Sequence, residues 1–316
     1  MPDQPPAGTL RFDGRVAVIT GAGRGLGRAY AELLAARGAK VVVNDTGAAI
    51  SGAGRDAGPA DEVASAVKAA GGDAIACADS VTTPEGGAAI IAAALTHYGR
   101  LDILIHNAGN NRYADLPEMS DDDYGSVLDV HLRGAFHVTR AAFPHMAQAG
   151  YGRIVLTSSI GGIYGNHRVA NYGSAKAGVI GLANVVALEG APRGIRCNVI
   201  IPAALTRLAE GLDTSFYPPM QPELVAPAVG WLAHEACTVT GEMLVALAGR
   251  VARAYIAETP GVYQPSWTIE DIAARMEEIR DPDGAWILPV VPSGHIDHIT
   301  RSFAMASGQN GRADEG

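Results

Sequence analysis

Apolar residues along the chain gather in short runs that are separated by alanine-rich stretches of mixed polarity. The runs rich in Val, Ile and Leu predict seven strands, at residues 16–20, 41–44, 74–78, 103–106, 154–157, 196–201 and 243–247. The early runs are apolar at consecutive positions rather than at alternating ones. Such runs are typical of strands that are buried on both faces of a parallel sheet.

Helical patterns fill the intervals between the predicted strands. In residues 26–34 the apolar side chains recur on one helical face, and Gly38 follows as a stop signal. Further helices are predicted at residues 61–70, 85–98, 121–148, 170–190 and 222–234. Strands that alternate with helices are joined by right-handed crossovers. The predicted fold is therefore α/β: a doubly wound, mostly parallel, seven-stranded Rossmann-type sheet with helices on both faces.

Composition and charge narrow the classes of partner. The chain carries 24 Lys and Arg against 33 Asp and Glu, and its net charge of −9 argues against nucleic acid or an anionic membrane as the main partner. No apolar run approaches the about 20 residues that a membrane-spanning helix needs. The cysteines stand far apart without metal-ligand spacing, so no metal site is predicted and a reduced, cytoplasmic protein is expected.

A glycine-rich turn follows the first predicted strand and leads into a helix. The turn reads Thr20-Gly21-Ala22-Gly23-Arg24-Gly25-Leu26-Gly27. Glycines let the backbone approach a pyrophosphate closely, and the start of the helix offers free N–H groups with a partial positive charge. Because the turn stands between a buried strand and an amphipathic helix, it indicates a dinucleotide site rather than a purely structural turn.

Asp45 ends the second predicted strand, 24 residues after Gly21. A carboxylate at this place binds the ribose hydroxyls of an adenosine and repels a 2′-phosphate. At ~4 Å and an effective dielectric of about 20, one such pair of charges is worth roughly 4 kcal/mol, so NAD is expected rather than NADP. Arg24 is the counter-argument, because its guanidinium can neutralise a phosphate.

Tyr172 and Lys176 lie four residues apart, so both fall on one face of a predicted helix. A phenol has a pKa of about 10, and general-base work near neutrality requires a shift of ~3 units, or ~4 kcal/mol. An ammonium ~4 Å away supplies about that much at intermediate dielectric, so the amine is expected to lower the pKa of the phenol. Lys176 is also one of only three lysines in an arginine-rich chain.

Ser159 stands 13 residues before Tyr172, just beyond a buried strand. A hydroxyl there can donate a hydrogen bond to a substrate oxygen as negative charge develops on it. Ser158 is the alternate donor, and backbone bonding at the strand end is its other interpretation.

In order and spacing these motifs resemble the short-chain dehydrogenase/reductase family over about residues 12–250. The resemblance rests on the Thr-Gly-x-x-x-Gly-x-Gly turn, Asn107-Ala108-Gly109, Ser159 and Tyr172-x-x-x-Lys176. It implies an enzyme that moves a hydride between a nicotinamide and a secondary alcohol or ketone. Tyr172 would be the acid–base, Lys176 would tune its pKa and bind the ribose, and Ser159 would hold the substrate oxygen.

The resemblance also implies a set of cofactor-binding residues. They are Gly21, Arg24, Gly25, Leu26, Gly27, Asp45, Asp79, Ser80, Asn107, Ala108, Gly109, Tyr172, Lys176, Pro202 and Thr206. Asp79 and Ser80 would lie near the adenine.

Two positions depart from the family pattern. His131 stands where the family has an asparagine that helps to hold a water in a proton relay, and Ala203 replaces the glycine that follows Pro202. His131 is therefore a candidate catalytic residue that carries protons or holds the water. A packed histidine that bonds the backbone of a bent helix is the equally open alternative.

The segments His131-Leu132-Arg133-Gly134 and Asn44-Asp45, the latter before a Gly-rich insertion at 47–60, resemble one subgroup of the family. These are the (3R)-hydroxyacyl-CoA dehydrogenase domains of peroxisomal multifunctional enzymes type 2, also called 17β-hydroxysteroid dehydrogenase type 4. The subgroup implies a (3R)-3-hydroxyacyl-CoA or a 17β-hydroxysteroid as the substrate. An NADPH-dependent 3-ketoacyl reductase is the alternative. A non-catalytic dinucleotide-binding regulator is the alternative of another class, although such proteins commonly lose the tyrosine or the lysine.

Three parts are predicted along the chain. Residues 1–11 form a disordered N-terminal tail, residues 12–250 the Rossmann-type dinucleotide-binding and catalytic domain, and residues 251–316 a C-terminal extension. One helix is predicted in the extension at residues 269–280, with Thr268 as its cap. The extension would cover the substrate cleft or a subunit interface. Relatives pair through the helices that match 121–148 and 170–190, so a homodimer or homotetramer is expected.

Overall fold

The computed structural model describes residues 8–54, 56–205 and 217–307. The chain divides into two compact units, Met1–Arg253 and Ala254–Gly316. Residues 1–7 of the expected N-terminal tail lie outside the described residues, whereas Phe12 is buried in the core of the first unit.

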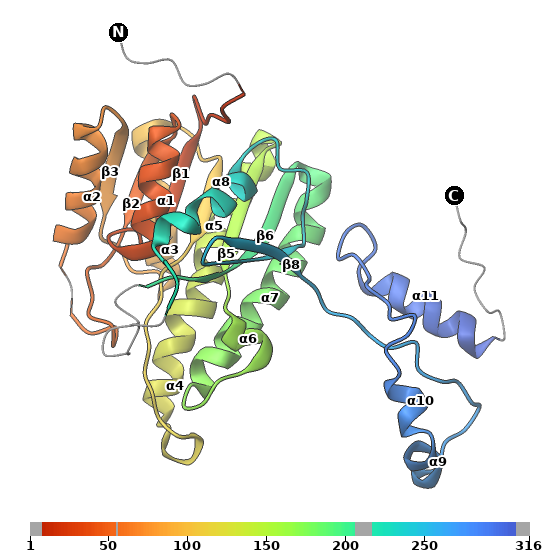
Figure 1. Cartoon of the computed structure of the whole chain (residues 1–316). Helices are drawn as coiled ribbons and strands as arrows, with labels where there is room; N and C mark the ends of the chain where they lie inside the picture. Colours follow the sequence, from red (N-terminus) through yellow and green to blue (C-terminus); the bar gives the residue numbers. More distant parts are fainter. Residues whose placement is uncertain (1–7, 55, 206–216, 308–316) are drawn as a thin grey trace. The chain divides into compact units, whose positions relative to one another are not determined.

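An eight-stranded sheet forms the centre of the first unit, in the order β3-β2-β1-β4-β5-β6-β7-β8 (Figure 1). Every pairing from β3 to β7 is parallel. The strands are β1 (Val16–Thr20), β2 (Lys40–Asn44), β3 (Asp73–Cys77), β4 (Ile103–His106), β5 (Gly152–Thr157), β6 (Ile195–Ala203), β7 (Met243–Leu247) and β8 (Arg250–Ala254). The strand order reverses between β1 and β4, and ligands of such sheets bind at the carboxyl ends of the strands beside this point.

The predicted fold class is confirmed, and the sheet has one strand more than predicted. β8 follows β7 after Ala248 and Gly249, whose φ angles of 48° and 79° are both left-handed. A two-residue turn of this kind matches the twist of an antiparallel hairpin. The strand was not predicted because its residues are exposed or only partly buried and include two arginines, unlike the apolar runs of the other strands.

Helices cover both faces of the sheet. One layer consists of α1 (Gly25–Ala36), α2 (Gly58–Ala69) and α8 (Ala226–Ala233), and the other of α3 (Pro84–Tyr98), α5 (Gly134–Ala149) and α7 (Ala170–Gly190). Every residue of β1, β4 and β5 is buried between these layers. This two-sided burial explains the consecutive apolar positions, and truncating a core side chain such as Ile105 to alanine is expected to cost about 2–5 kcal/mol.

The helix predicted at residues 121–148 is interrupted. It consists of α4 (Asp121–Leu128), a π-helical segment (Asp129–Arg133) and α5. Such π-bulges interrupt α-helices at functional sites. The segment carries His131, which is almost fully buried.

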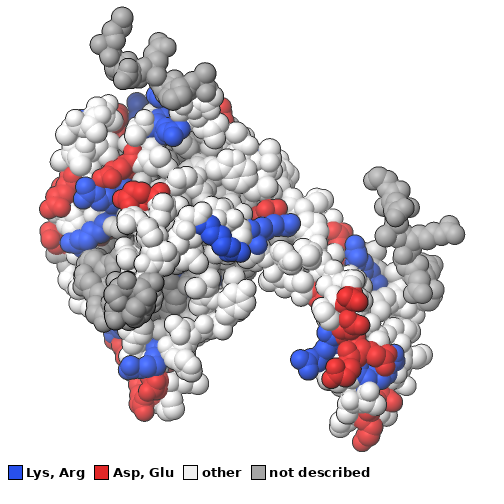
Figure 2. All heavy atoms as spheres, in the orientation of Figure 1, with Lys and Arg blue, Asp and Glu red and all other residues white. Residues whose placement is uncertain are grey.

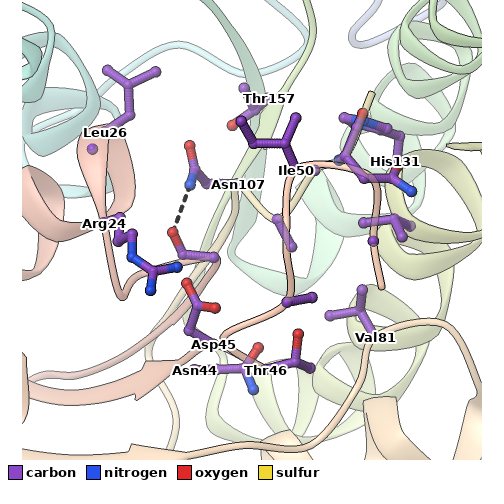
Figure 3. Close-up of a pocket in the computed structure, with 18 of the residues that line it drawn as sticks. Arg24, Leu26, Asn44, Asp45, Thr46, Ile50, Val81, Asn107, His131 and Thr157 are labelled. Carbon is purple, nitrogen blue, oxygen red and sulfur yellow. Dashed lines mark hydrogen bonds between the residues drawn. The ribbon is translucent and has the colours of Figure 1, made fainter. Parts of the chain in front are cut away.

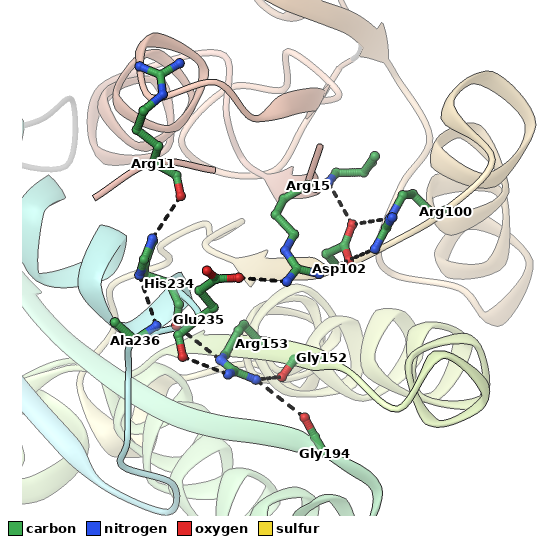
Figure 4. A network of polar contacts seen from close by, with 11 residues as sticks. Arg11, Arg15, Arg100, Asp102, Gly152, Arg153, Gly194, His234, Glu235 and Ala236 are labelled. Atoms are coloured by element: carbon green, nitrogen blue, oxygen red, sulfur yellow. Dashed lines mark hydrogen bonds and ion pairs between the residues drawn. The ribbon is translucent and has the colours of Figure 1, made fainter. Parts of the chain in front are cut away.

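The amino end of the sheet holds a buried arginine (Figure 4). The guanidinium of Arg153 donates to the carbonyls of Gly152 at 2.9 Å, His234 and Glu235 at 3.2 Å, and Gly194 at 3.4 Å. Its Cζ lies 4.4 Å from the ring centroid of Tyr151. These bonds join β5 to the chain after α8 and to the turn before β6, so the arginine holds this end of the sheet together.

The second unit contains α9 (Ile269–Ala274), α10 (Met276–Arg280) and α11 (His295–Ala306). The predicted helix 269–280 is thus two short helices, and its cap is confirmed, because Thr268 and Asp271 form a capping box. α11 was not predicted. No described residue of Ala254–Gly316 is buried, so this unit by itself has no apolar core.

The surface and the helices add two further observations. On the face drawn in Figure 2, Lys and Arg side chains are interspersed with Asp and Glu and form no continuous basic patch.

Among the described residues, no helix has both the length and the apolar character that crossing a membrane requires.

Candidate active site

A cavity of about 390 Å³ opens at the carboxyl ends of the strands, over the point where the strand order reverses. Segments that follow β1, β2, β3, β4, β5 and β6 all contribute to its walls, together with α7 and the π-helical segment. Figure 3 draws most of these residues. Among the described residues, no group of three or more His, Cys, Asp or Glu side chains is placed to hold a metal ion.

The glycine-rich turn lines one end of the cavity and requires glycine for two reasons. Gly21 has a left-handed φ of 64°, and a Cβ there would lie 2.7 Å from the Cα of Ala108. A Cβ on Gly27 would overlap the carbonyl oxygen of Gly21. α1 begins at Gly25, so its free N–H groups and its dipole face the cavity. Gly27 does not itself line the cavity.

Asp45 lies beside this turn and is held by backbone groups. Its Oδ2 accepts from the Gly23 N–H at 2.9 Å and its Oδ1 from the Gly47 N–H at 2.7 Å. Two N–H donors fix the orientation of the carboxylate without neutralising its charge.

Arg24 faces the same cavity with a buried Nη1 that has no hydrogen-bond partner in the described part of the chain. Buried polar groups normally have partners, so an unpartnered guanidinium nitrogen points to a ligand. An anionic, polyhydroxylated ligand fits this end of the cavity: the guanidinium and the helix start suit its phosphates, and Asp45 suits its hydroxyls. A dinucleotide has these groups.

The wall between β2 and β3 adds further predicted residues. Asp79 and Ser80 line the cavity, together with Val81 and Thr82. Asn44 was not predicted as a lining residue, although it lies next to Asp45. Its amide donates to the carbonyls of Cys77 at 3.0 Å and Asp79 at 2.8 Å and so fixes the chain after β3.

Asn107, Ala108 and Gly109 follow β4 along the floor of the cavity. The Asn107 amide donates to the carbonyl of Gly21 at 3.0 Å, which ties the fourth strand to the glycine-rich turn (Figure 3). A Cβ on Gly109 would come within 2.5 Å of Cε1 of His131. Glycine is therefore needed at 109 to admit the histidine ring.

Tyr172 and Lys176 project from α7 into the cavity, as their spacing predicts. The Lys176 amine is buried, lies 5.6 Å from the ring centroid of Tyr172, and donates to the carbonyl of Thr157 at 2.6 Å. Burial lowers the pKa of Lys176 to about 7. A desolvated amine of this kind is typical of functional sites.

The pKa of Tyr172 differs from the expectation. Burial raises the pKa of the phenol, and a hydrogen bond with the Ser159 side chain opposes this shift. The expected lowering by Lys176 is absent because burial dominates and the amine bonds the carbonyl of Thr157 rather than the phenol. The four-residue spacing gives the shared helix face but does not give the direction of the amine.

Ser158 and Ser159, which follow β5, form different hydrogen bonds. Ser159 caps α6 (Ile160–Tyr164), where its hydroxyl accepts from the Gly161 N–H at 3.1 Å, and its side chain acts to lower the pKa of Tyr172. Ser159 is not among the residues that line the cavity. Ser158 lines the cavity, but its hydroxyl donates to the carbonyl of Lys176 at 2.7 Å. Ser158 is therefore engaged in backbone bonding.

His131 reaches the cavity from the π-helical segment. Its Nε2 lies 2.8 Å from the Asn110 carbonyl and 3.2 Å from the Asn110 N–H, and its ring packs edge-on against Tyr172 with centroids 5.2 Å apart. Burial lowers the pKa of His131 well below its ordinary value, so the ring is neutral. Its Nδ1 has no partner among the described residues. The backbone bonding fits a packed histidine, and the unpartnered Nδ1 keeps proton transfer open.

The remaining predicted residues lie near β6 or beyond it. Pro202 lines the cavity with Ala203 and Ala204. Thr206 lies outside the described residues. Sequence reasoning missed the contribution of Ala48, Ala49, Ile50 and Gly52, which line the cavity from the insertion after β2. The Gly- and Ala-rich composition of that insertion was its one visible signal.

Comparison with known proteins establishes the family. The short chain dehydrogenase family matches residues 15–212. The chain belongs to this family. Its members are oxidoreductases that use a nicotinamide dinucleotide, so the fold and the enzyme class read from the motifs are confirmed.

Individual relatives show which subgroup of the family this chain resembles. The chain is 48% identical over 276 residues to peroxisomal multifunctional enzyme type 2 of Drosophila melanogaster, an alignment that covers 87% of this chain and 45% of the relative. It is 42% identical over 275 residues to a putative short-chain type dehydrogenase/reductase of Mycobacterium tuberculosis, covering 86% and 96% of the two chains. The structure of the full-length Drosophila enzyme superposes with a TM-score of 0.78 at 38% identity, over 96% of this chain and 51% of the other. The predicted subgroup resemblance is confirmed, and this chain spans about half the length of the Drosophila enzyme.

The expected cytoplasmic location is wrong. Relatives from Drosophila melanogaster, Mus musculus, Dictyostelium discoideum and Saccharomyces cerevisiae are all named as peroxisomal proteins. Reduced cysteines do not point to the cytoplasm in particular, because they fit any compartment that does not form disulfides.

Proposed function

We propose that this chain oxidises the 3-hydroxyl group of a (3R)-3-hydroxyacyl-CoA with NAD⁺. The observation that carries the proposal is the joint placement of Asp45, Tyr172 and Lys176 on one cavity. A carboxylate for the adenosine ribose and a phenol–amine pair thus lie on the walls of a single binding space. The subgroup resemblance supports an acyl-CoA substrate, and a 17β-hydroxysteroid is the second substrate class it supports.

The proton chemistry follows from Tyr172 and Lys176, which line the cavity, and from Ser159, which is not among its lining residues. When bound, NAD⁺ supplies the ring that accepts the hydride from the carbinol carbon. Tyr172, as phenolate, takes the hydroxyl proton, and the carbon–oxygen bond becomes a ketone as the hydride leaves. Ser159 opposes the rise in the pKa of the phenol and would donate to the same substrate oxygen. Lys176 would place its amine near the nicotinamide ribose.

The choice of NAD over NADP rests on Asp45. Both of its oxygens already accept backbone N–H groups, so the carboxylate is fixed in place and keeps its charge. A 2′-phosphate brought near it would be repelled by roughly 4 kcal/mol at about 4 Å and an effective dielectric of about 20.

An NADPH-dependent 3-ketoacyl reductase is the second candidate, and one observation favours it. The unpartnered Nη1 of Arg24 lies in the same cavity and offers a charged partner to a 2′-phosphate. Steady-state rates with NAD(H) and NADP(H) decide between the two. A clear NADP(H) preference would overturn the role given to Asp45.

The substrate assignment is tested with a panel of candidate substrates in the presence of NAD⁺. The formation of NADH is the measured signal. The panel contains (3R)- and (3S)-3-hydroxyacyl-CoAs of short, medium and long chain and 17β-hydroxysteroids. We expect kcat/KM to be highest for a (3R)-3-hydroxyacyl-CoA and at least about a hundredfold lower for its (3S) epimer, because the wrong epimer misaligns hydride and phenol. Equal rates for the epimers, or activity with steroids alone, would overturn the assignment.

We further propose a homodimer or homotetramer, from the helix pairing typical of the family. Light scattering at micromolar concentration tests it, and a monomer would contradict it.

A further inference from the structure

Residues 47–54, here called the cavity insert, follow Asp45 along one wall of the cavity. Ala48, Ala49, Ile50 and Gly52 all line it. In the view of Figure 3, Ile50 lies towards His131 and away from Arg24, so the insert extends from the carboxylate end of the cavity to the end near the reaction site. The insert thus borders the cavity from its carboxylate end towards His131.

The near end of the insert is fixed by local backbone bonds. The Gly47 N–H donates to Asp45 at 2.7 Å, and the Asp56 N–H donates to the carbonyl of Thr46 at 2.8 Å. Gly47 has a left-handed φ of 67°, and a Cβ there would overlap the carbonyl oxygen of Asp56. The insert therefore begins and ends at one fixed base.

The far end is held by the segment after β4, about 60 residues along the chain. The Asn111 N–H donates to the carbonyl of Ile50 at 3.0 Å, and the Arg112 Nε donates to the carbonyl of Ser51 at 3.2 Å. Arg112 Nη1 also donates to Asp122 at 2.7 Å and to Asp123 at 2.9 Å, at the start of α4. One guanidinium thus joins the tip of the insert to the start of α4.

The same arginine is joined to the reaction site through its backbone. The buried Asn171 amide donates to the carbonyls of Arg112 at 3.0 Å and Asp123 at 3.1 Å, and its oxygen accepts from the Tyr172 N–H at 2.7 Å. Arg112 is not among the residues that line the cavity. Any effect it has on catalysis therefore passes through the insert or through α7.

We propose that Arg112 is a positioning residue that latches the cavity insert over the bound dinucleotide, so that the dinucleotide leaves only when the latch opens. The proposal rests on the proposed function, because it requires a dinucleotide in the cavity. The latch is built from an arginine with 27% exposure and an aspartate, Asp122, with 85% exposure. It is accessible to salt, so it can open without unfolding of the sheet.

The test is the dissociation rate of NADH from the full chain, measured by stopped-flow displacement. We expect Arg112→Ala to raise the dissociation rate about tenfold and Asp122→Asn about threefold, with association changed less than about twofold. Asp121→Asn is the matched control, since it removes the same charge from the same helix turn at a side chain that forms no ion pair in the described structure. The control should release NADH at the wild-type rate.

The salt dependence of the NADH release rate distinguishes a latch from a purely structural role of Arg112, because a structural role would not make release depend on salt. Raising the salt concentration should speed NADH release from the wild type and from the Asp121→Asn variant, and should leave Arg112→Ala nearly unchanged. If Arg112→Ala fails to fold, the release rate of Asp122→Asn still tests the latch, because the Asp122 side chain is exposed and its exchange should not disturb folding. Wild-type release rates in both Arg112→Ala and Asp122→Asn would overturn the latch alone. A wild type that binds neither NADH nor NADPH would instead overturn the proposed function.

Discussion

The two ends of the parallel sheet each bury one cation, and the surroundings of the two cations are opposite. At the amino end, the Arg153 guanidinium donates to four backbone carbonyls, and each of its nitrogens is used (Figure 4). At the carboxyl end, the Lys176 amine donates to one carbonyl, that of Thr157, among the described residues. Arg153 thus uses four of the five N–H donors of a guanidinium, whereas Lys176 uses one of the three donors of an ammonium.

The same contrast holds for the neighbours. Four of the buried side-chain atoms that lack a partner in the described structure belong to residues that line the cavity: Arg24, Asn110, His131 and Thr157. None belongs to the cluster around Arg153. Since unpartnered buried groups are costly, their concentration at one end marks the place where a ligand completes the bonding. The amino end stabilises the fold, and the carboxyl end gives up stability for chemistry.

Removing the phenol should have the largest effect. Tyr172→Phe is expected to lower kcat by about 10²- to 10⁴-fold, because general acid–base catalysis contributes that much, while the Kd for NADH changes less than about threefold. Steady-state kinetics and fluorescence titration measure the two. Tyr151→Phe at the amino end is the matched control and should keep wild-type kcat. Full turnover in Tyr172→Phe would remove the mechanism.

Exchanging each buried cation for methionine tests the comparison directly. Lys176→Met should lower kcat/KM by about a hundredfold or more and leave the protein at least as stable as the wild type at pH 6. Arg153→Met should lower the free energy of unfolding by about 3 kcal/mol, because four carbonyls lose their donor, while kcat at 25 °C changes less than about twofold. Denaturant unfolding and steady-state kinetics are the measurements. The contrast between the two ends of the sheet would be contradicted if both variants lost mainly activity or both lost mainly stability.

The carboxylate at the other end of the cavity should set cofactor choice. Asp45→Asn is expected to reduce the preference for NAD over NADP by about 10²- to 10³-fold, which follows from the loss of roughly 4 kcal/mol of repulsion. The ratio of kcat/KM for the two cofactors measures it. Asp79→Asn removes another carboxylate of the cavity wall and should change the ratio less than about threefold. An unchanged preference in Asp45→Asn would contradict the assignment of NAD.

The smallest expected effect concerns His131. His131→Asn should lower kcat less than about threefold, because an amide can still bond the backbone of Asn110. His131→Phe keeps a ring but loses that bond, and should lower kcat about tenfold. Turnover numbers of the two variants separate the roles. Equal, large losses in both would favour a proton-carrying histidine over a packed one.

Much of the fold was readable because the strands are buried on both faces. Residues 16–19 and 103–105 are apolar at consecutive positions, and each run lies between two helical layers. β8 lacks this signal, and its turn places Ala248 in a left-handed conformation that alanine disfavours. The π-helical segment was hidden because helical periodicity continues across residues 129–133.

The parts of the site that could be predicted from the sequence are those that depend on the spacing of motif residues. The spacing of Tyr172 and Lys176 gives a common helix face, and the glycine-rich turn with Asp45 gives the opposite wall. The bond from Arg112 to Ser51 spans 61 residues and ends on a backbone carbonyl, so it leaves no pattern of residue types. The pKa of Tyr172 was misjudged for a related reason, since burial is a property of the packed site.

The pH dependence of stability tests the central claim most directly. Lysine titrates at 10.5 in an ordinary setting and at about 7 in this fold, so between these values the unfolded chain binds a proton that the folded chain does not. The burial penalty is therefore fully present below pH ~7 and is relieved as the pH rises towards ~10. We predict that the difference in unfolding free energy between the wild type and Lys176→Met moves by several kcal/mol in favour of the wild type from pH 6 to pH 10. A difference that stays constant across this range would contradict a desolvated amine in the cavity.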